Sequence, residues 1–172
     1  MPDTLTPETM KFGIGQPVPR NEDPVLLRGE GRYTDDVALP GALHAVFVRS
    51  QHAHGVLRGI DVSAARGMPG VVAVLTAADL LGYGHIRCAL PLKNADGSPL
   101  RSTDRPSLAT DRLRFVGDPF ACVIAETRAA AKDAAELVLA EVEPLPAVTS
   151  AREAAQPGAP QLYDSLPGNL AL

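Results

Sequence analysis

Among the four histidines of the chain, the only close pair is His52 and His54. In an extended segment, residues i and i+2 point to the same side, so the two imidazoles could face one metal ion. A third ligand is not evident, because the remaining histidines, His44 and His85, stand apart. The pair is therefore interpreted as hydrogen-bonding histidines in a turn between two strands, and no metal-ligating residue is assigned.

Carboxylates and nucleophiles offer no clearer catalytic pair. Asp35 and Asp36 are adjacent, and neighbours in a strand point to opposite faces, so they are interpreted as turn and cap residues. Cys122 lies in an apolar strand and is expected to be an inert core thiol, whereas Cys88 lies in a polar loop where it could be exposed. No base partner is evident for the serines considered, Ser50, Ser63 and Ser102. No catalytic residue is assigned.

Cofactor-binding patterns are equally incomplete. The dinucleotide fingerprint needs three glycines between a strand and a helix. Gly13 with Gly15, and Gly29 with Gly31, supply only two each and lack that context. Walker A, GxSxG and HExxH motifs do not occur. Two cysteines cannot provide the four thiolates of an iron–sulfur cluster. We therefore expect this chain to bind no cofactor by itself.

Composition and charge narrow the class further. The 172 residues suit one domain, and 45% hydrophobic and 21% charged residues are ordinary for a soluble globular protein. A net charge of −4 without a basic stripe argues against nucleic-acid binding. No apolar run approaches the roughly 20 residues of a membrane span. The N-terminus lacks signal-peptide features. A disulfide between Cys88 and Cys122 is possible but unsupported, so we expect reduced thiols in a cytoplasmic protein.

The elements that must position these residues are short strands interrupted by turns. β-Branched and aromatic clusters between Gly and Pro signals predict the strands, with a bend at Pro119. They are expected over 42–50, 55–62, 71–76, 113–115, 120–125 and 141–148.

One helix dominates the pattern. Thr127 is a good N-cap, and the alanine-rich stretch 127–139 has high helix propensity. Its expected inner face is Ala130, Ala134, Leu137 and Val138. Shorter helices are expected over 64–68, capped by Ser63, over one turn near 76–79, and over 149–155. Strands with few helices give an α+β fold with a mixed sheet.

The expected organisation has three parts. Residues 1–27 form an extended N-terminal arm, 28–149 the folded domain, and 150–172 a linker. Residues 82–111 form a loop long enough to suggest a function or a bound partner. Within it, 90–110 is the candidate for partner contact or for the rim of a substrate funnel. Arg101 and Arg105 could contact anions there but are interpreted as solvated surface residues.

Seven segments in order resemble one family. They are GEGRYTDD at 29–36 with LPGAL at 39–43, FVRSQHAH at 47–54, IDVSAA at 60–65, MPGV at 68–71, AVLTAADL at 73–80, FVGDP at 115–119 and VEPLPAV at 142–148. Together they resemble the N-terminal α/β-hammerhead domain of the molybdopterin-binding large subunit of xanthine dehydrogenases, aldehyde oxidases and aerobic carbon monoxide dehydrogenases. The resemblance covers about residues 12–172.

The resemblance implies a non-catalytic structural and assembly domain of a molybdenum hydroxylase. In that family, the remainder of the large subunit holds the molybdenum–molybdopterin pocket and a catalytic glutamate, beyond position 172 here. Partner subunits or domains carry [2Fe–2S] clusters and FAD. The reaction hydroxylates an aldehyde, an N-heterocycle or carbon monoxide with water as oxygen source. Residues 167–172 resemble the start of a further strand, which suggests a fragment or a split subunit.

Two alternatives stay open. The chain could be a free-standing protein-interaction module that reuses the fold without redox chemistry. It could also be a small self-sufficient enzyme such as a hydrolase, which the missing nucleophile–base pair disfavours. The sequence leaves the substrate and the oligomeric state undetermined, and the chain alone is predicted to be inactive.

Overall fold

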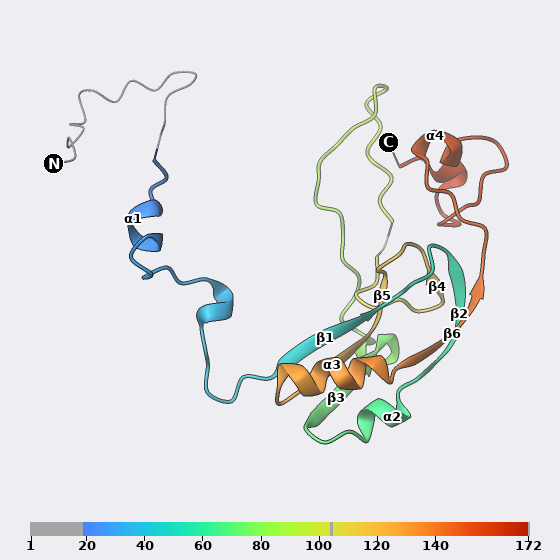
Figure 1. Cartoon of the computed structure of the whole chain (residues 1–172). Coiled ribbons are helices and arrows are strands. Elements are labelled where there is room, and N and C mark those ends of the chain that lie inside the picture. The colour runs from blue at the N-terminus through green and yellow to red at the C-terminus, as the bar shows by residue number, and fades with distance from the viewer. Residues whose placement is uncertain (1–18, 104, 172) are drawn as a thin grey trace, which may run out of the picture. The chain divides into compact units, whose positions relative to one another are not determined.

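The computed structural model describes residues 19–103 and 105–171 and divides the chain into two compact units, 1–40 and 41–172. In the first unit, the described residues form the single-turn helix α1 (Asp23–Leu26) and the 3-10 turn η2 (Thr34–Asp36) (Figure 1). None of residues 19–40 is buried, and Leu27 and Tyr33 are largely exposed. This segment therefore has no hydrophobic core of its own. Expectations about residues 1–18, including Gly13 and Gly15, lie outside the described residues.

The second unit contains two three-stranded antiparallel sheets (Figure 1). The first has the order β1 (His44–Arg49), β5 (Pro119–Ala125), β3 (Val71–Thr76). The second has the order β4 (Arg112–Leu113), β2 (Gly55–Asp61), β6 (Leu139–Pro144). The α+β class is confirmed. Instead of the expected mixed sheet, the strands form two separate sheets, and every strand pair in them is antiparallel.

The separation into two sheets begins at Ser50, directly after β1. A hairpin would continue from β1 into β2, but the Ser50 amide donates to the Asp118 carbonyl, and the Ser50 carbonyl accepts from Gly117. These bonds attach the end of β1 to the turn before β5. The chain then leaves this sheet, and β2 pairs with β6.

The principal helix α3 (Arg128–Glu136) lies across the first sheet, in contact with β1, β5 and β3 (Figure 1). As predicted, Thr127 caps it, accepting a hydrogen bond from the Ala130 amide through its side chain. The buried face consists of Ala131, Ala134 and, just beyond the helix, Val138. The expected face was partly wrong, because Leu137 is 41% exposed where the helix ends and the chain turns into β6.

The remaining helices are single turns. They are α2 (Ser63–Arg66), η3 (Ala77–Leu80), α4 (Ala151–Ala154) and η4 (Pro167–Asn169). Ser63 was expected to cap α2, but its hydroxyl and amide both donate to the Asp61 carboxylate, so Asp61 holds this turn. The Thr76 amide and hydroxyl both donate to the Asp79 carboxylate at the start of η3, and Ser150 caps α4.

The strand bounds differ most from the expectation at β4 and β6. β4 stops at Leu113 because the Arg114 amide donates to the Asp118 carboxylate, which starts the turn before β5. β6 stops at Pro144, and Pro146 follows at once; neither proline has an N–H to continue a ladder. The hydrophobic core lies between the first sheet, α3 and the second sheet, around Leu57, Val74 and Val123.

Candidate functional site

The histidines singled out by their spacing lie in the turn between β1 and β2. His54 is 5% exposed, and its Nδ1 lies 2.8 Å from the Pro146 carbonyl oxygen, which can only accept; Nδ1 therefore carries the proton. The His52 amide donates to the Ser50 hydroxyl oxygen, which in turn donates to the His52 carbonyl. Both residues thus take part in turn hydrogen bonds.

The described residues do not bring these histidines together with further ligands. Across 19–103 and 105–171, no group of three or more His, Cys, Asp or Glu side chains is placed to hold a metal ion. The His54 Nε2 atom is buried without a hydrogen-bond partner in the described structure. It lies in the turn beside Pro146 and does not line the pocket described below.

The buried carboxyl of this region belongs to Asp118, which the sequence analysis did not single out. Its Oδ2 accepts a hydrogen bond from the Arg114 amide at 3.0 Å, and burial raises its pKa above the usual aspartate range. Its backbone carbonyl accepts from Ser50. Asp118 therefore ties together the ends of β1, β4 and β5. Its position before Pro119, in a turn with left-handed Gly117, was the available signal.

The paired acidic residues and the cysteines also have structural positions. Asp36 accepts a hydrogen bond from the Tyr33 amide and closes η2, as expected for a cap residue. Cys122 is 6% exposed in β5, and burial raises the pKa of its thiol, so this thiol is shielded and unreactive. Cys88 is exposed in the long loop, and neither cysteine forms a disulfide.

Most described residues of the long loop 82–111 are exposed, although Leu108 and Ala109 near its end are buried. Two isolated bridges, Ile86 with Arg105 and Lys93 with Pro99, hold its two halves antiparallel. At its tip, the Asp96 carboxylate accepts from the Ser98 amide and hydroxyl, which lowers the Asp96 pKa. The Arg101 amide donates to the Ala171 carbonyl, so the loop also contacts the end of the described chain.

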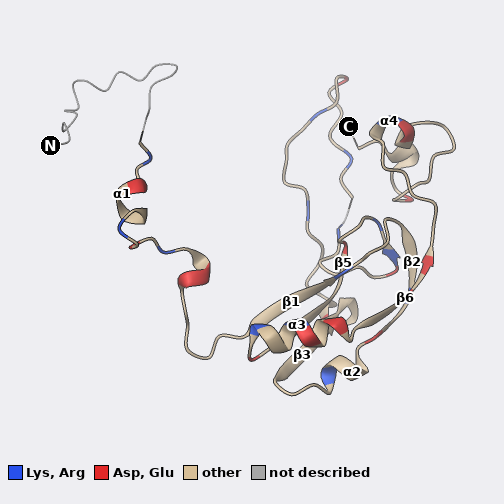
Figure 2. Ribbon diagram, in the orientation of Figure 1, with Lys and Arg blue, Asp and Glu red and all other residues tan. Residues whose placement is uncertain are grey.

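This loop presents apolar and basic side chains together. All residues from 81 to 93 are exposed, and the large apolar ones are Leu81, Tyr83, Ile86, Leu90 and Leu92. Positive charges lie along both halves of the loop (Figure 2). The Arg105 guanidinium stacks 5.1 Å from the centre of the Phe115 ring, which makes Arg105 part of the loop's attachment. Such a surface has the composition of a partner contact.

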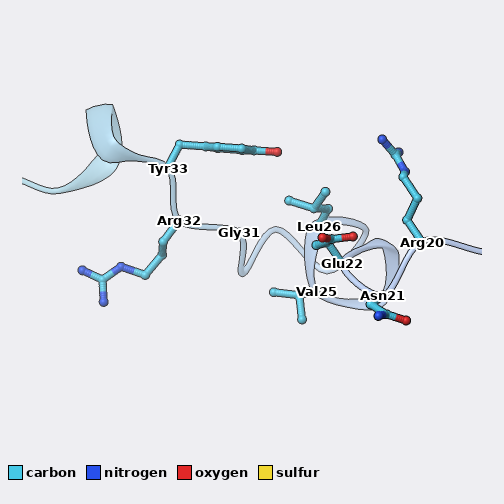
Figure 3. Close-up of a pocket in the computed structure, with 8 residues that line it drawn as sticks. All are labelled: Arg20, Asn21, Glu22, Val25, Leu26, Gly31, Arg32 and Tyr33. Carbon is cyan, nitrogen blue, oxygen red and sulfur yellow. The ribbon is translucent and has the colours of Figure 1, made fainter. Parts of the chain in front are cut away.

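The first unit has a pocket of its own, formed where the chain folds back after α1 (Figure 3). Val25, Leu26 and Tyr33 supply its apolar part, and Gly31 approaches Leu26 closely. Arg20 and Arg32 extend at its two ends (Figure 3). A single turn with exposed apolar side chains buries too little surface to be stable alone, so this segment also has the character of a contact surface.

Among the described residues, no helix combines the length and the apolar character needed to cross a membrane.

Comparisons with known proteins place these features in a family. Residues 28–146 match the sequence model of "Aldehyde oxidase and xanthine dehydrogenase, a/b hammerhead domain". The chain is 42% identical over 171 residues to the nicotine 6-hydroxylase large subunit of Paenarthrobacter nicotinovorans, covering 99% of this chain and 20% of that protein. It is 40% identical over 154 residues to the carbon monoxide dehydrogenase large chain of Afipia carboxidovorans, covering 90% and 18%.

Comparison with solved structures leads to the same family. Quinoline 2-oxidoreductase from Pseudomonas putida 86 superimposes with a TM-score of 0.79 at 40% identity, covering 95% of this chain and 20% of that one. A Cu,Mo-CO dehydrogenase structure gives a TM-score of 0.69 at 40% identity, covering 86% and 18%. The chain therefore spans about a fifth of the length of these relatives. With most of its length matched by the family's sequence model and its fold shared with members of solved structure, the chain belongs to the aldehyde oxidase and xanthine dehydrogenase a/b hammerhead domain family.

Proposed function

We propose that this chain is a non-catalytic structural and assembly domain of a molybdenum hydroxylase, an oxidoreductase that hydroxylates an aldehyde, an N-heterocycle or carbon monoxide. The observation that carries the proposal is the family match combined with a span of about one fifth of the relatives. The polar side chains that could have done chemistry serve turns instead, as with His54, Ser50 and Asp118.

The residues of this chain do not fit the cofactors that the family implies. A [2Fe–2S] cluster takes four thiolates, whereas this chain has two cysteines, one buried in β5 and one exposed in the loop. We therefore assign molybdenum–molybdopterin to the remainder of a large subunit, and [2Fe–2S] and FAD to partner subunits or domains. The domain boundaries at 27 and 149 and a cytoplasmic location belong to the same proposal.

The test is co-expression of this chain with the large-subunit region that follows the matched segment in the relatives and with the iron–sulfur and FAD partners. The complex should co-purify with molybdenum, iron and FAD and should turn over substrate, whereas the isolated chain should do neither. Cofactor retention or turnover by the isolated chain would overturn the non-catalytic role. Failure to associate with those partners would favour a free-standing interaction module.

Within this function, residues 90–110 of the loop are proposed to contact a partner or to border the substrate funnel. Leu90→Ser with Leu92→Ser should leave the stability of the free chain unchanged, because both side chains are exposed in it. In the complex, the pair should weaken subunit association or raise KM. The matched control is Leu139→Ser, an exposed leucine on β6. Unchanged association and KM in the loop variant would remove this assignment.

A further inference from the structure

One face of the first sheet is apolar and is not covered by α3. Strand register aligns Phe47, Cys122 and Leu75 in one row across β1, β5 and β3, and Ala45, Ile124 and Ala73 in the next row. Residues paired directly across antiparallel strands point to the same face. These six residues, which we name the open sheet face, therefore form two adjacent rows without a charged side chain.

The opposite face of the same sheet is covered in the ordinary way. Val74, Ala121 and Val123 are fully or almost fully buried, in one cluster with Ala134 of α3 and Ala65 of α2. The helices that pack on this sheet thus occupy that side.

Exposure on the open sheet face differs sharply from exposure on the covered side. Phe47 is 49% exposed, Ala45 is exposed, and Leu75, Ala73 and Ile124 are only partly buried. Only Cys122, at the centre between its cross-strand neighbours, is shielded. The Arg49 guanidinium lies 5.6 Å from the centre of the Phe47 ring and marks the rim. An apolar centre with a charged rim is the usual anatomy of a protein interface.

The sheet also lacks protection at its borders. In the described structure, β1 and β3 are both edge strands of this three-stranded sheet. Proteins that expose such a sheet to solvent usually place charges on it to prevent association. Because this face carries no charged residue among its six members, we infer that a partner covers it permanently, as in obligate interfaces.

We infer that the open sheet face docks against the remainder of a large-subunit polypeptide, an inference that rests on the proposed function. The relatives carry this domain within chains about five times as long, since it covers 20% of the nicotine 6-hydroxylase large subunit. A large polypeptide that accompanies the domain in every molecule can cover an uncharged face permanently. The occupant is therefore an apolar surface of that polypeptide, not a second copy of this domain.

The direct test is a thiol footprint. In a Cys88→Ser background, Ala45→Cys places a small reactive group on the open sheet face, and Val72→Cys places one on β3 outside both rows, where the native valine is 55% exposed. Both thiols should react readily in the free chain. In the complex with the complementary large-subunit region, labelling at position 45 should slow by roughly tenfold or more, as access is lost, while position 72 changes little.

Affinity gives an independent measurement. Phe47→Asp should weaken association with the complementary region by at least about tenfold, because a charge is buried at an apolar centre. Val72→Asp is the matched control and should stay within about twofold. Unfolding curves of the free chains check that each variant folds. If Phe47→Asp does not fold, the footprint at position 45 decides alone.

The outcomes separate the two proposals. If the unsubstituted chain does not bind the complementary region, the proposed function fails. If it binds but position 45 reacts at the same rate in the complex as in the free chain, the docking face is wrong and the function stands. Concentration-dependent protection of position 45 in the isolated chain would assign the face to a second copy, and protection lost on removing residues 1–40 would assign it to the arm.

Discussion

Asp118 illustrates how single polar residues organise this domain. Its side chain is 8% exposed and accepts the Arg114 amide, while its backbone carbonyl accepts the Ser50 amide. Burial disfavours the charged carboxylate, which is why the pKa of Asp118 is raised. The residue therefore stabilises a junction of three strands at an electrostatic cost that depends on pH.

Substitution of Asp118 should separate these two effects. Asp118→Ala leaves the partly buried Arg114 amide without an acceptor and should lower the free energy of unfolding by about 1–3 kcal/mol. Asp118→Asn keeps an acceptor oxygen and should fold with near-native stability. Urea denaturation of both variants at neutral pH measures the difference. Equal losses for both variants would show that packing, not the hydrogen bond, is what matters.

The pH dependence follows from the sign of the shift. Because the folded protein binds the Asp118 proton more tightly than the unfolded chain does, stability is lost as pH rises from roughly 4, the ordinary aspartate pKa, through the raised value. Asp118→Asn removes this loss. The native chain should therefore lose stability relative to the Asn variant over that interval.

At the scale of elements, small side chains decide how closely α3 lies on the first sheet. Ala131 and Ala134 on the helix, and Ala121 and Ala125 on β5, are all fully buried. Alanines on both sides bring the helix backbone close to the strands, so that there is no space for larger residues. A small residue also permits a close approach in the second sheet. At Gly55, a Cβ would lie 2.6 Å from the Val142 side chain.

A matched pair of substitutions on α3 tests this packing. Ala131→Leu must fit a larger side chain against the sheet and should cost about 1–3 kcal/mol of unfolding free energy. Ala129→Leu lies on the exposed side and should stay within about 0.5 kcal/mol of the native chain. Thermal and urea unfolding provide the comparison. A loss at position 129 as large as that at position 131 would contradict the assigned face.

At the scale of the molecule, stability and contact surface belong to different parts of the chain. Every described buried residue lies within 41–172, and the core joins both sheets. By contrast, residues 19–40 and most of the loop 82–111 are exposed and present apolar groups. This division is consistent with the proposed assembly role, in which partners would cover the exposed apolar groups.

Removing residues 1–40 should therefore leave the fold intact. The truncated chain 41–172 should unfold in one cooperative transition, with a free energy within about 1 kcal/mol of the whole chain, because no described residue of 19–40 is buried. Denaturant titration followed by circular dichroism measures this. Loss of the transition would mean that the first unit contributes to the core. Association with the large-subunit partners should weaken in the same truncated chain.

Local sequence was sufficient for the features that depend on a few adjacent residues. Thr127 was predicted as a helix cap because a hydroxyl reaches an amide three residues ahead. The strands around β1, β2, β3 and β5 followed from apolar runs between Gly and Pro turns. The resemblance in seven ordered segments identified the family before any contact was known.

The chain by itself thus determined the element types and the family. Only the tertiary structure decided three features: the separation into two sheets, the face of α3 that is buried, and the position of Asp118. These features depend on contacts between residues far apart in sequence, such as Ser50 and Asp118. The open sheet face is of the same kind. Phe47, Leu75 and Cys122 become neighbours only when three strands pair in one register, and the free energy of that pairing is spread over the whole core.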